Sequence, residues 1–534
     1  MPLPPLSLPP EGIFPSVHHP EVLSSSCPSG IFSTPPIADI TLPFSPFYPF
    51  THSIMANLSS LAKDTAIYGL SSIVGRFLNY LLVPLYTNCM PKESGDYGVS
   101  VNIYAYTALI LVILTFGMET TFFRFANKEG EKADTVFTTT FVVIASLTVV
   151  FLGLMFGFIG PISAALNYSD HPEYLLMMSA VVALDAIQAL PFSYLRYQKR
   201  PIKFAALKML FIVFNILLNV LYMVVLGKTD VFYVFCINLW CTAAITFFFV
   251  PEFYRLKWKF DAQLMRRMLS YSWPILVLGI AGVLNQTADK IIFPLVNATP
   301  TAQAELGEYG ACVKVAMIMA MITQAFRYAY EPIVFAKTKD RDSKEYYAHA
   351  MKYFIIFTLV AFLGVMGYMD VLKYLIGPEY RDGLTVVPIV MAAEIMMGIY
   401  FNLSFWYKII DKTIWGAVFS ITGCLVLIAV NIFFIPRFGY MACAWGGFAG
   451  YAVAMILSYL VGQKLYPIDY DLKGIMRYVV LAAVLYVAMV NLPDSWPSWV
   501  KIVLNTGLIA LFLLEVIRRD LKASSLPVVG KYFK

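Results

Sequence analysis

Gly95-Asp96-Tyr97-Gly98 recurs in the second half of the chain as Gly307-Glu308-Tyr309-Gly310, and its neighbourhood recurs with it. A Pro-Leu pair precedes each copy, a glutamate follows each copy at the same separation, and a Phe-Ala pair closes each unit. These anchors are Pro84-Leu85 and Pro294-Leu295, Glu119 and Glu331, and Phe125-Ala126 and Phe335-Ala336. Together with the tetrapeptide itself, these make four anchors in the same order, which indicates a duplicated unit.

The composition is that of a membrane protein. Of the 534 residues, 59% are hydrophobic and only 13% are charged, and the mean hydropathy is +0.70, which excludes an ordinary soluble domain. The net charge of +6 resides in short loops between apolar runs, so it indicates membrane topology and no nucleic-acid partner. The seven cysteines are scattered and the five histidines do not cluster with carboxylates, so we expect no metal site and no cofactor.

Fourteen apolar runs are each long enough for one bilayer crossing and predict an all-α polytopic protein. They cover about 64–88, 97–118, 134–160, 173–195, 202–226, 231–250, 271–296, 308–330, 348–368, 384–406, 413–435, 441–463, 474–491 and 497–517. Lys and Arg concentrate in the loops after spans 2, 4, 6 and 8 and after the last span. The positive-inside rule therefore predicts that both termini are cytoplasmic and supports an even number of spans.

The repeat and the spans together predict the domain organisation. Six spans separate the two copies, so the halves cross in the same direction and form two like-facing six-helix lobes around a central cleft. Residues 55–250 form the N-lobe, 251–270 a basic cytoplasmic linker, 271–465 the C-lobe, and 466–534 two extra helices and a cytoplasmic tail. The linker suits either an interfacial segment on an anionic leaflet or a solvated connection.

Residues 1–54 differ from the rest, because they are rich in Pro and Ser and contain no Lys or Arg. This composition predicts disorder. We interpret Met55 as the functional start and 1–54 as an extension that is not native, with a genuine cytoplasmic tail as the alternative.

The two tetrapeptides should lie on the outer, non-cytoplasmic side, at the start of the second helix of each lobe. Their glycines are interpreted as the turn and first residues of that helix. Their acidic residues are interpreted as N-terminal cap partners, which makes the motif scaffold.

A charge in the middle of a span costs roughly 2.5–3.5 kcal/mol and therefore needs a water-filled cavity, a partner or a task. The candidates for a cationic, hydrogen-bonding cavity are Arg76, Asn79, Tyr80, Lys208, Asn215, Asn219, Lys314 and Arg327. The candidates for ion coupling are the carboxylates Asp185, Asp289, Glu331 and Glu394. The alternatives are interhelical hydrogen bonds for the asparagines, snorkelling for Lys208 and Arg327, and pairing of Asp289 with Lys290 or Arg76.

Enzyme signatures are weak. Asp340-Arg341-Asp342 and Asp469-Tyr470-Asp471 match the DxD pattern of glycosyltransferases, but both fall in short loops without room for a nucleotide-binding domain. The outside loops are also short, which argues against a membrane-embedded polysaccharide polymerase or ligase. We therefore expect no enzymatic activity.

Several motifs carry a family resemblance. The stretch 75–85, the tetrapeptide 95–98, Gly117-Met118-Glu119-Thr120 and Asp289-Lys290-Ile291-Ile292 resemble the multidrug/oligosaccharidyl-lipid/polysaccharide exporter superfamily. Within it, the chain is most similar to bacterial Wzx-type polysaccharide flippases over about residues 58–520. The resemblance implies the fold of the MATE exporters and lipid II flippases of that superfamily.

The resemblance also implies a function. It is the movement of an undecaprenyl-pyrophosphate-linked oligosaccharide across the bacterial inner membrane by alternating access, for O-antigen, lipopolysaccharide or other surface polysaccharide. Implied partners are this lipid-linked oligosaccharide, membrane lipids, a polysaccharide polymerase and glycosyltransferases. A lipid II flippase and a MATE-like cation or drug antiporter remain the alternatives, and the glycan and the coupling ion stay open.

Overall fold

The computed structural model describes residues 80–255, 257–297, 299–337, 343–493 and 495–520. The chain divides into two units, Met1–Ser59 and Ser60–Lys534, and every described residue belongs to the second. The expectations for 1–54, for Asp340-Arg341-Asp342 and for most of the first span, including Arg76 and Asn79, therefore lie outside the described residues.

Helices account for nearly all of the described chain, and no strand occurs among these residues. The first half contains α2 (Leu82–Cys89), η1 (Lys92–Ser94), α3 (Asp96–Thr115), α4 (Met118–Ala126), α5 (Ala133–Gly157), α6 (Ile159–Ala165), α7 (Pro172–Tyr197), α8 (Pro201–Val220), η2 (Leu221–Val225), α9 (Val231–Phe247) and α10 (Val250–Arg255). The second half contains α11 (Ala262–Val296), α12 (Ala302–Lys337), α13 (Ser343–Gly367), α14 (Met369–Leu372), η3 (Lys373–Leu375), η4 (Pro378–Val386), α15 (Val387–Leu403), α16 (Phe405–Ile409), α17 (Ile414–Phe438), α18 (Tyr440–Leu465), α19 (Leu472–Val490) and α20 (Ser498–Arg519).

Thirteen helical segments within the described ranges are long and apolar enough to cross a membrane. They coincide with the second to fourteenth predicted spans, which confirms those spans; the first lies mostly outside the described residues. The chain is therefore a multi-pass membrane protein with an all-helical fold.

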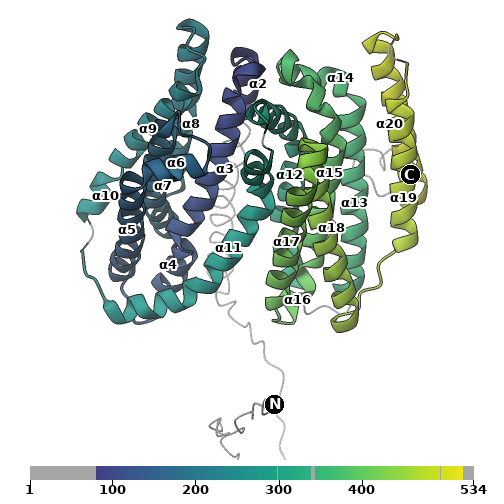
Figure 1. Cartoon of the computed structure of the whole chain (residues 1–534). Coiled ribbons are helices and arrows are strands. Elements are labelled where there is room, and N and C mark those ends of the chain that lie inside the picture. Colours follow the sequence, from purple (N-terminus) through teal and green to yellow (C-terminus); the bar gives the residue numbers. More distant parts are fainter. Residues whose placement is uncertain (1–79, 256, 298, 338–342, 494, 521–534) are drawn as a thin grey trace, which may run out of the picture. The chain divides into compact units, whose positions relative to one another are not determined.

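The helices group into the two expected lobes. In the N-lobe, α4, α5 and α7 share one apolar core around Phe122 and Phe137, while α8 packs on α9 (Figure 1). In the C-lobe, α15, α17 and α18 pack together, and α12 contacts α15. The two extra helices α19 and α20 pack on α13, where Lys352 forms ion pairs with Asp471 at 2.9 Å and Asp520 at 2.5 Å.

The connection between the lobes is shorter than predicted. Helix α11 begins at Ala262, because the carboxylate of Asp261 accepts hydrogen bonds from the backbone amides of Gln263 and Leu264 and caps the helix. With α10 ending at Arg255, much of the expected linker 251–270 is helical. Helix α11 is 35 residues long, and in Figure 1 its first part lies across the lower end of the molecule before the helix turns upward between the lobes.

The two glycine tetrapeptides meet each other where α3 crosses α12. A Cβ atom on Gly98 would lie 1.7 Å from the carbonyl oxygen of Gln303 and 3.0 Å from the amide nitrogen of Gly307. A Cβ atom on Gly310 would lie 2.7 Å from the Val101 side chain. The lobes therefore touch backbone to backbone, and only glycine permits this approach.

The structure corrects the capping interpretation of the motif. Gly95 adopts a left-handed conformation with φ 72°, as a turn before α3 requires. Helix α12, however, begins at Ala302, so Glu308 lies within the helix and cannot cap it. The Glu308 carboxylate is buried and forms an ion pair with Lys92 at 2.7 Å.

Replacing Gly98 with Ala should destabilise the protein, because the added methyl group overlaps the Gln303 carbonyl and forces α3 and α12 apart. Overpacking of this kind costs about 1–3 kcal/mol. We expect a lower midpoint of thermal unfolding for Gly98→Ala in detergent. The matched control is Gly153→Ala in α5, where a Cβ atom meets nothing within 4 Å. Equal midpoints for the two variants would contradict the backbone contact.

Candidate functional site

A cavity of about 480 Å³ lies between the lobes and is called the interlobe cavity below. The N-lobe helices α2, α3, α8 and α9 form one wall, and the C-lobe helices α11, α12, α15, α17 and α18 form the other. Both tetrapeptides contribute a tyrosine to the lining, Tyr97 and Tyr309. The motif interpreted as scaffold therefore also shapes the cavity.

An ion pair lies on the C-lobe wall. The ammonium group of Lys290 is 3.1 Å from the carboxylate of Asp289, and the Tyr309 hydroxyl donates to the same carboxylate at 2.7 Å. Lys290 also donates to the backbone oxygen of Gln286 at 3.0 Å. Asp289 thus lines the cavity but is paired with Lys290, which was one of the two alternatives for it.

Two further charged residues complete the wall. Lys314 on α12 and Glu394 on α15 line the cavity, and both lie near enough to Lys290 to interact with its charge. Within the described part of the chain, neither side chain has an ion-pair or hydrogen-bond partner. The described lining therefore carries two cations and two carboxylates, and Lys314 is the cation without a paired carboxylate.

The asparagine stripe on α8 has two different environments. Asn215 lines the cavity. Asn219 is fully buried, accepts a hydrogen bond from the Tyr86 hydroxyl at 3.1 Å and donates to the backbone oxygen of Asn215 at 2.7 Å. Asn219 is thus an interhelical contact. Tyr80, the first described residue, is half-buried and does not line the cavity.

Lys208 and Asp185 lie outside the interlobe cavity, inside the N-lobe. The ammonium group of Lys208 lies 4.1 Å above the centre of the Phe192 ring. Asp185 on α7 is near enough to Lys208 for the two charges to attract each other. The two charges therefore interact with each other inside the N-lobe and do not face the cavity.

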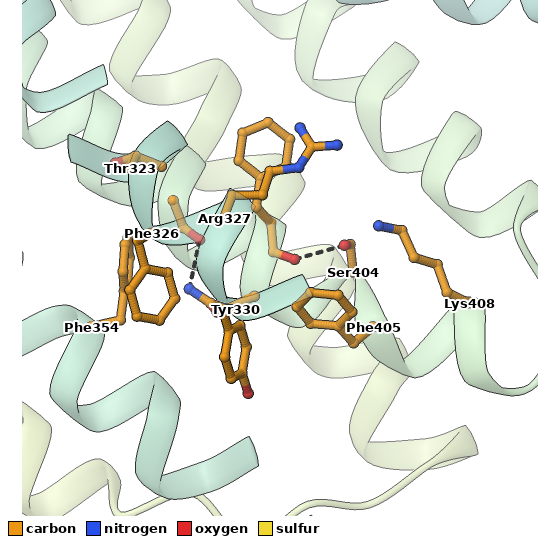
Figure 2. Close-up of a pocket in the computed structure, with 11 residues that line it drawn as sticks. Thr323, Phe326, Arg327, Tyr330, Phe354, Ser404, Phe405 and Lys408 are labelled. Atoms are coloured by element: carbon orange, nitrogen blue, oxygen red, sulfur yellow. Dashed lines mark hydrogen bonds between the residues drawn. The ribbon is translucent and has the colours of Figure 1, made fainter. Parts of the chain in front are cut away.

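Arg327 lines a smaller pocket toward the end of α12 (Figure 2), and Glu331 follows it by one helical turn. Figure 2 shows Arg327 and Lys408 around a set of aromatic rings that includes Phe326, Tyr330 and Phe405. Glu331 accepts from Lys408 at 3.0 Å and lies 3.5 Å from Arg327. These two predicted site residues are therefore not part of the interlobe cavity.

The ion pair at Glu331 has a counterpart in the N-lobe. Glu119, the equivalent glutamate of the first repeat, pairs with Arg196 at 3.2 Å. Each partner follows its glutamate by 77 residues. The duplication therefore extends from the second helix of each lobe to the end of the fourth, and this equal spacing is a signal that the sequence analysis missed.

Contacts between the lobes close one end of the cavity, called the capped end below. It comprises the end of α2, η1, the starts of α3 and α12, and η4. Lys92 bonds to Glu308 through its ammonium group and to Glu379 through its backbone amide at 2.8 Å. The Tyr380 hydroxyl donates to the Met90 carbonyl at 3.1 Å, and the Gly377 amide donates to the Thr87 hydroxyl at 2.9 Å.

Lys92 stays charged throughout the physiological range. Burial works to lower the pKa of its ammonium group, but the hydrogen bond and the negative charge of Glu308 outweigh burial and raise the pKa above its usual value. The ion pair therefore contributes fully to stability below the usual lysine pKa, and this contribution is lost as the pH rises through the raised pKa of Lys92.

Several cavity residues were not named as site candidates. Lys290 was one of the charged residues within a span and a possible partner for Asp289, and Tyr309 was part of the repeated tetrapeptide. Tyr104, Asn238 and Tyr451 also line the cavity. Their signal in the sequence is only that each is a polar or aromatic residue inside an apolar run, which does not tell which face of the helix it occupies.

Known proteins share this architecture. The structure of the lipid II flippase MurJ in an inward closed conformation matches with a TM-score of 0.67 at 14% identity, covering 84% of this chain and 98% of that one. An inward-facing multidrug resistance MATE family transporter of the MOP superfamily matches with a TM-score of 0.59 at 13% identity, covering 73% and 94%. The MATE multidrug transporter DinF-BH matches with a TM-score of 0.55 at 18% identity, covering 75% and 95%.

These likenesses establish the fold. No curated protein matches the chain. A model of the family described as "Polysaccharide biosynthesis protein" matches residues 93–383, which is more than half of the chain and includes α3, α12 and both tetrapeptides. The chain therefore belongs to the polysaccharide biosynthesis protein family and has the fold of the multidrug/oligosaccharidyl-lipid/polysaccharide exporter superfamily.

Proposed function

We propose that this protein is a flippase that moves a polyprenyl-pyrophosphate-linked oligosaccharide across the bacterial inner membrane for surface polysaccharide biosynthesis. The observation that carries the proposal is Lys314, a cation without a paired carboxylate among the described residues, in a cavity between two lobes. A cation inside a membrane-spanning helix is costly unless an anion neutralises it, and a pyrophosphate is such an anion.

Translocation would proceed by alternating access. The pyrophosphate and its first sugars enter the interlobe cavity while the prenyl tail stays in lipid, and the lobes rock around the site. With the capped end outside, as the charge pattern of the loops predicts, the inside-negative potential favours outward movement of the anion. This contribution is about 2.3 kcal/mol per charge per 100 mV.

Ion coupling would use a carboxylate of the cavity. Of the four candidates, Glu331 is engaged by Lys408 and Arg327, and Asp185 lies beside Lys208 away from the cavity. Asp289 is bonded by Lys290 and Tyr309. Glu394 lines the cavity, and no described residue bonds to it. We therefore propose Glu394 as the coupling carboxylate.

A cation or drug antiporter is the second candidate. The described lining contains two carboxylates beside its two cations, so charge alone does not exclude a cationic substrate. The family match favours a polysaccharide precursor. A lipid II flippase would use the same anionic group and differs in the glycan.

Reconstitution separates these functions. The purified full-length protein in liposomes would be tested with a lipid-linked oligosaccharide, with lipid II and with a fluorescent organic cation. We expect translocation of the lipid-linked oligosaccharide. Transport of the cation alone would overturn the proposal in favour of an antiporter, and selective movement of lipid II would replace the proposed substrate.

Lys314→Ala should abolish surface polysaccharide without lowering the amount of protein in the membrane, because the pyrophosphate loses its counter-charge. Lys314→Arg should retain part of the activity, since it keeps the charge. The matched control is Lys257→Ala, which removes an exposed cation outside the cavity. The amount of surface polysaccharide is compared with the amount of the protein in the membrane on immunoblots. A normal amount in the Lys314→Ala strain would contradict the anion-binding role of Lys314.

Opening of the capped end should depend on Lys92 and Glu308. Glu308→Gln removes the charge that holds Lys92, so the closed arrangement should become less populated. Cys443 also lines the cavity, so the native cysteines are first replaced by serine, and a reporter cysteine is placed at Ser100, which lines the cavity on α3. Labelling from the capped side by a membrane-impermeant maleimide should be faster in Glu308→Gln. A Lys92→Glu, Glu308→Lys double variant should return labelling toward the wild-type rate, and equal rates in all variants would rule out the ion pair as a closing contact.

A further inference from the structure

The two walls of the interlobe cavity differ in charge. All four charged residues of the described lining lie on the C-lobe wall. The described N-lobe lining is neutral, and its polar members are Tyr86, Tyr97, Ser100, Tyr104, Asn215 and Asn238. A neutral wall of hydroxyl and amide groups suits an uncharged, hydrogen-bonding part of a substrate better than it suits a phosphate.

Among the three tyrosines of this wall, Tyr104 is the one presented to the cavity. Tyr86 and Tyr97 are only 8% and 3% exposed. The Tyr86 hydroxyl is used by Asn219, and the Tyr97 ring packs edge-on against Tyr380 with 5.8 Å between ring centres. Tyr104 is 36% exposed and lines the cavity, so it has the most surface open to a ligand among these tyrosines.

Helix α9 holds Tyr104 in place. The Asn238 amide donates to the Tyr104 hydroxyl at 2.8 Å, and the Asn238 carbonyl oxygen accepts from the Thr242 hydroxyl at 3.3 Å. The Tyr104 ring also meets Phe235 edge-on at 6.2 Å. Because the hydroxyl oxygen accepts from Asn238, the hydroxyl proton remains available to a ligand, in a fixed direction.

We propose that Tyr104 and Asn238 select the glycan. The Tyr104 ring packs against the apolar face of a sugar ring, and its hydroxyl donates to a sugar oxygen, while Lys314 on the opposite wall binds the pyrophosphate. This inference rests on the proposed function, because it requires a lipid-linked glycan in the cavity. A volume of about 480 Å³ is in the usual range for small-molecule sites, so the selected unit is the sugar next to the pyrophosphate.

Three probes test this selection with the full-length protein in liposomes. They are a polyprenyl pyrophosphate without sugar, the same lipid with one sugar, and that lipid with one sugar hydroxyl removed. The measured quantity is the rate of translocation of each. We expect the wild type to prefer the intact sugar over the deoxy sugar by about tenfold, the effect of one hydrogen bond to a preorganised group.

Tyr104→Phe keeps the ring and removes the hydroxyl, so this preference should fall to near unity while the sugar-free lipid moves at the wild-type rate. Asn238→Leu removes the group that orients Tyr104 and should act in the same direction, which provides a second variant if the first is unstable. The matched control is Tyr106→Phe, a neighbour on α3 that does not line the cavity.

The outcomes separate the two proposals. If the wild type translocates the lipids and both variants keep its preference, the selecting role of Tyr104 and Asn238 is overturned and the flippase proposal stands. If the wild type moves none of the three lipids, the flippase proposal is overturned, and this inference is overturned with it.

Discussion

The arrangement of the lobes depends on one contact, the crossing of α3 and α12 at Gly98 and Gly307. The missing side chains allow the two backbones to touch, so a Cβ atom on Gly98 would fall 1.7 Å from a carbonyl oxygen. The short distance between the two backbones determines the positions of the neighbouring side chains. Tyr97 and Tyr309 lie beside the crossing and contribute to the cavity lining, and Glu308 lies within ion-pair distance of Lys92.

Glu308 and Tyr309, consecutive residues of the second tetrapeptide, link the capped end to the charged residues of the C-lobe wall. Glu308 pairs with Lys92 across the lobes, and Tyr309 donates to Asp289, which is itself paired with Lys290. A substrate anion that draws Lys290 away from Asp289 would therefore alter the hydrogen bond between Tyr309 and Asp289. Tyr309 is adjacent to Glu308, which forms the closing ion pair with Lys92. A short, contiguous network of this kind is a physical route by which binding can bias closure, provided that the capped end has two states.

Hydropathy predicted the spans because the bilayer dictates their length and polarity, and the repeated anchors predicted two like-facing lobes. The sequence could not tell which face of a helix meets the cavity. Asn215 and Asn219 are one turn apart on α8, yet one lines the cavity and the other bonds to Tyr86. Arg327 and Lys314 are both single cations in an apolar run of the same helix, and only Lys314 lines the interlobe cavity.

The two halves agree where they build the scaffold and differ where they line the cavity. The pairs Glu119–Arg196 and Glu331–Lys408 keep the same spacing of 77 residues.

Four residues beyond the last glycine of each tetrapeptide, however, the first half has Asn102 and the second has Lys314. Asn102 is buried and uses its amide on the Lys290 carbonyl at 2.7 Å and its oxygen on the Tyr168 hydroxyl at 2.8 Å. An amide with both ends satisfied fixes α3 to α11, whereas the lysine at the equivalent position has no such partner among the described residues. Divergence at one duplicated position has thus left a hydrogen bond between the lobes on α3 and, among the described residues, an unpaired cation on α12.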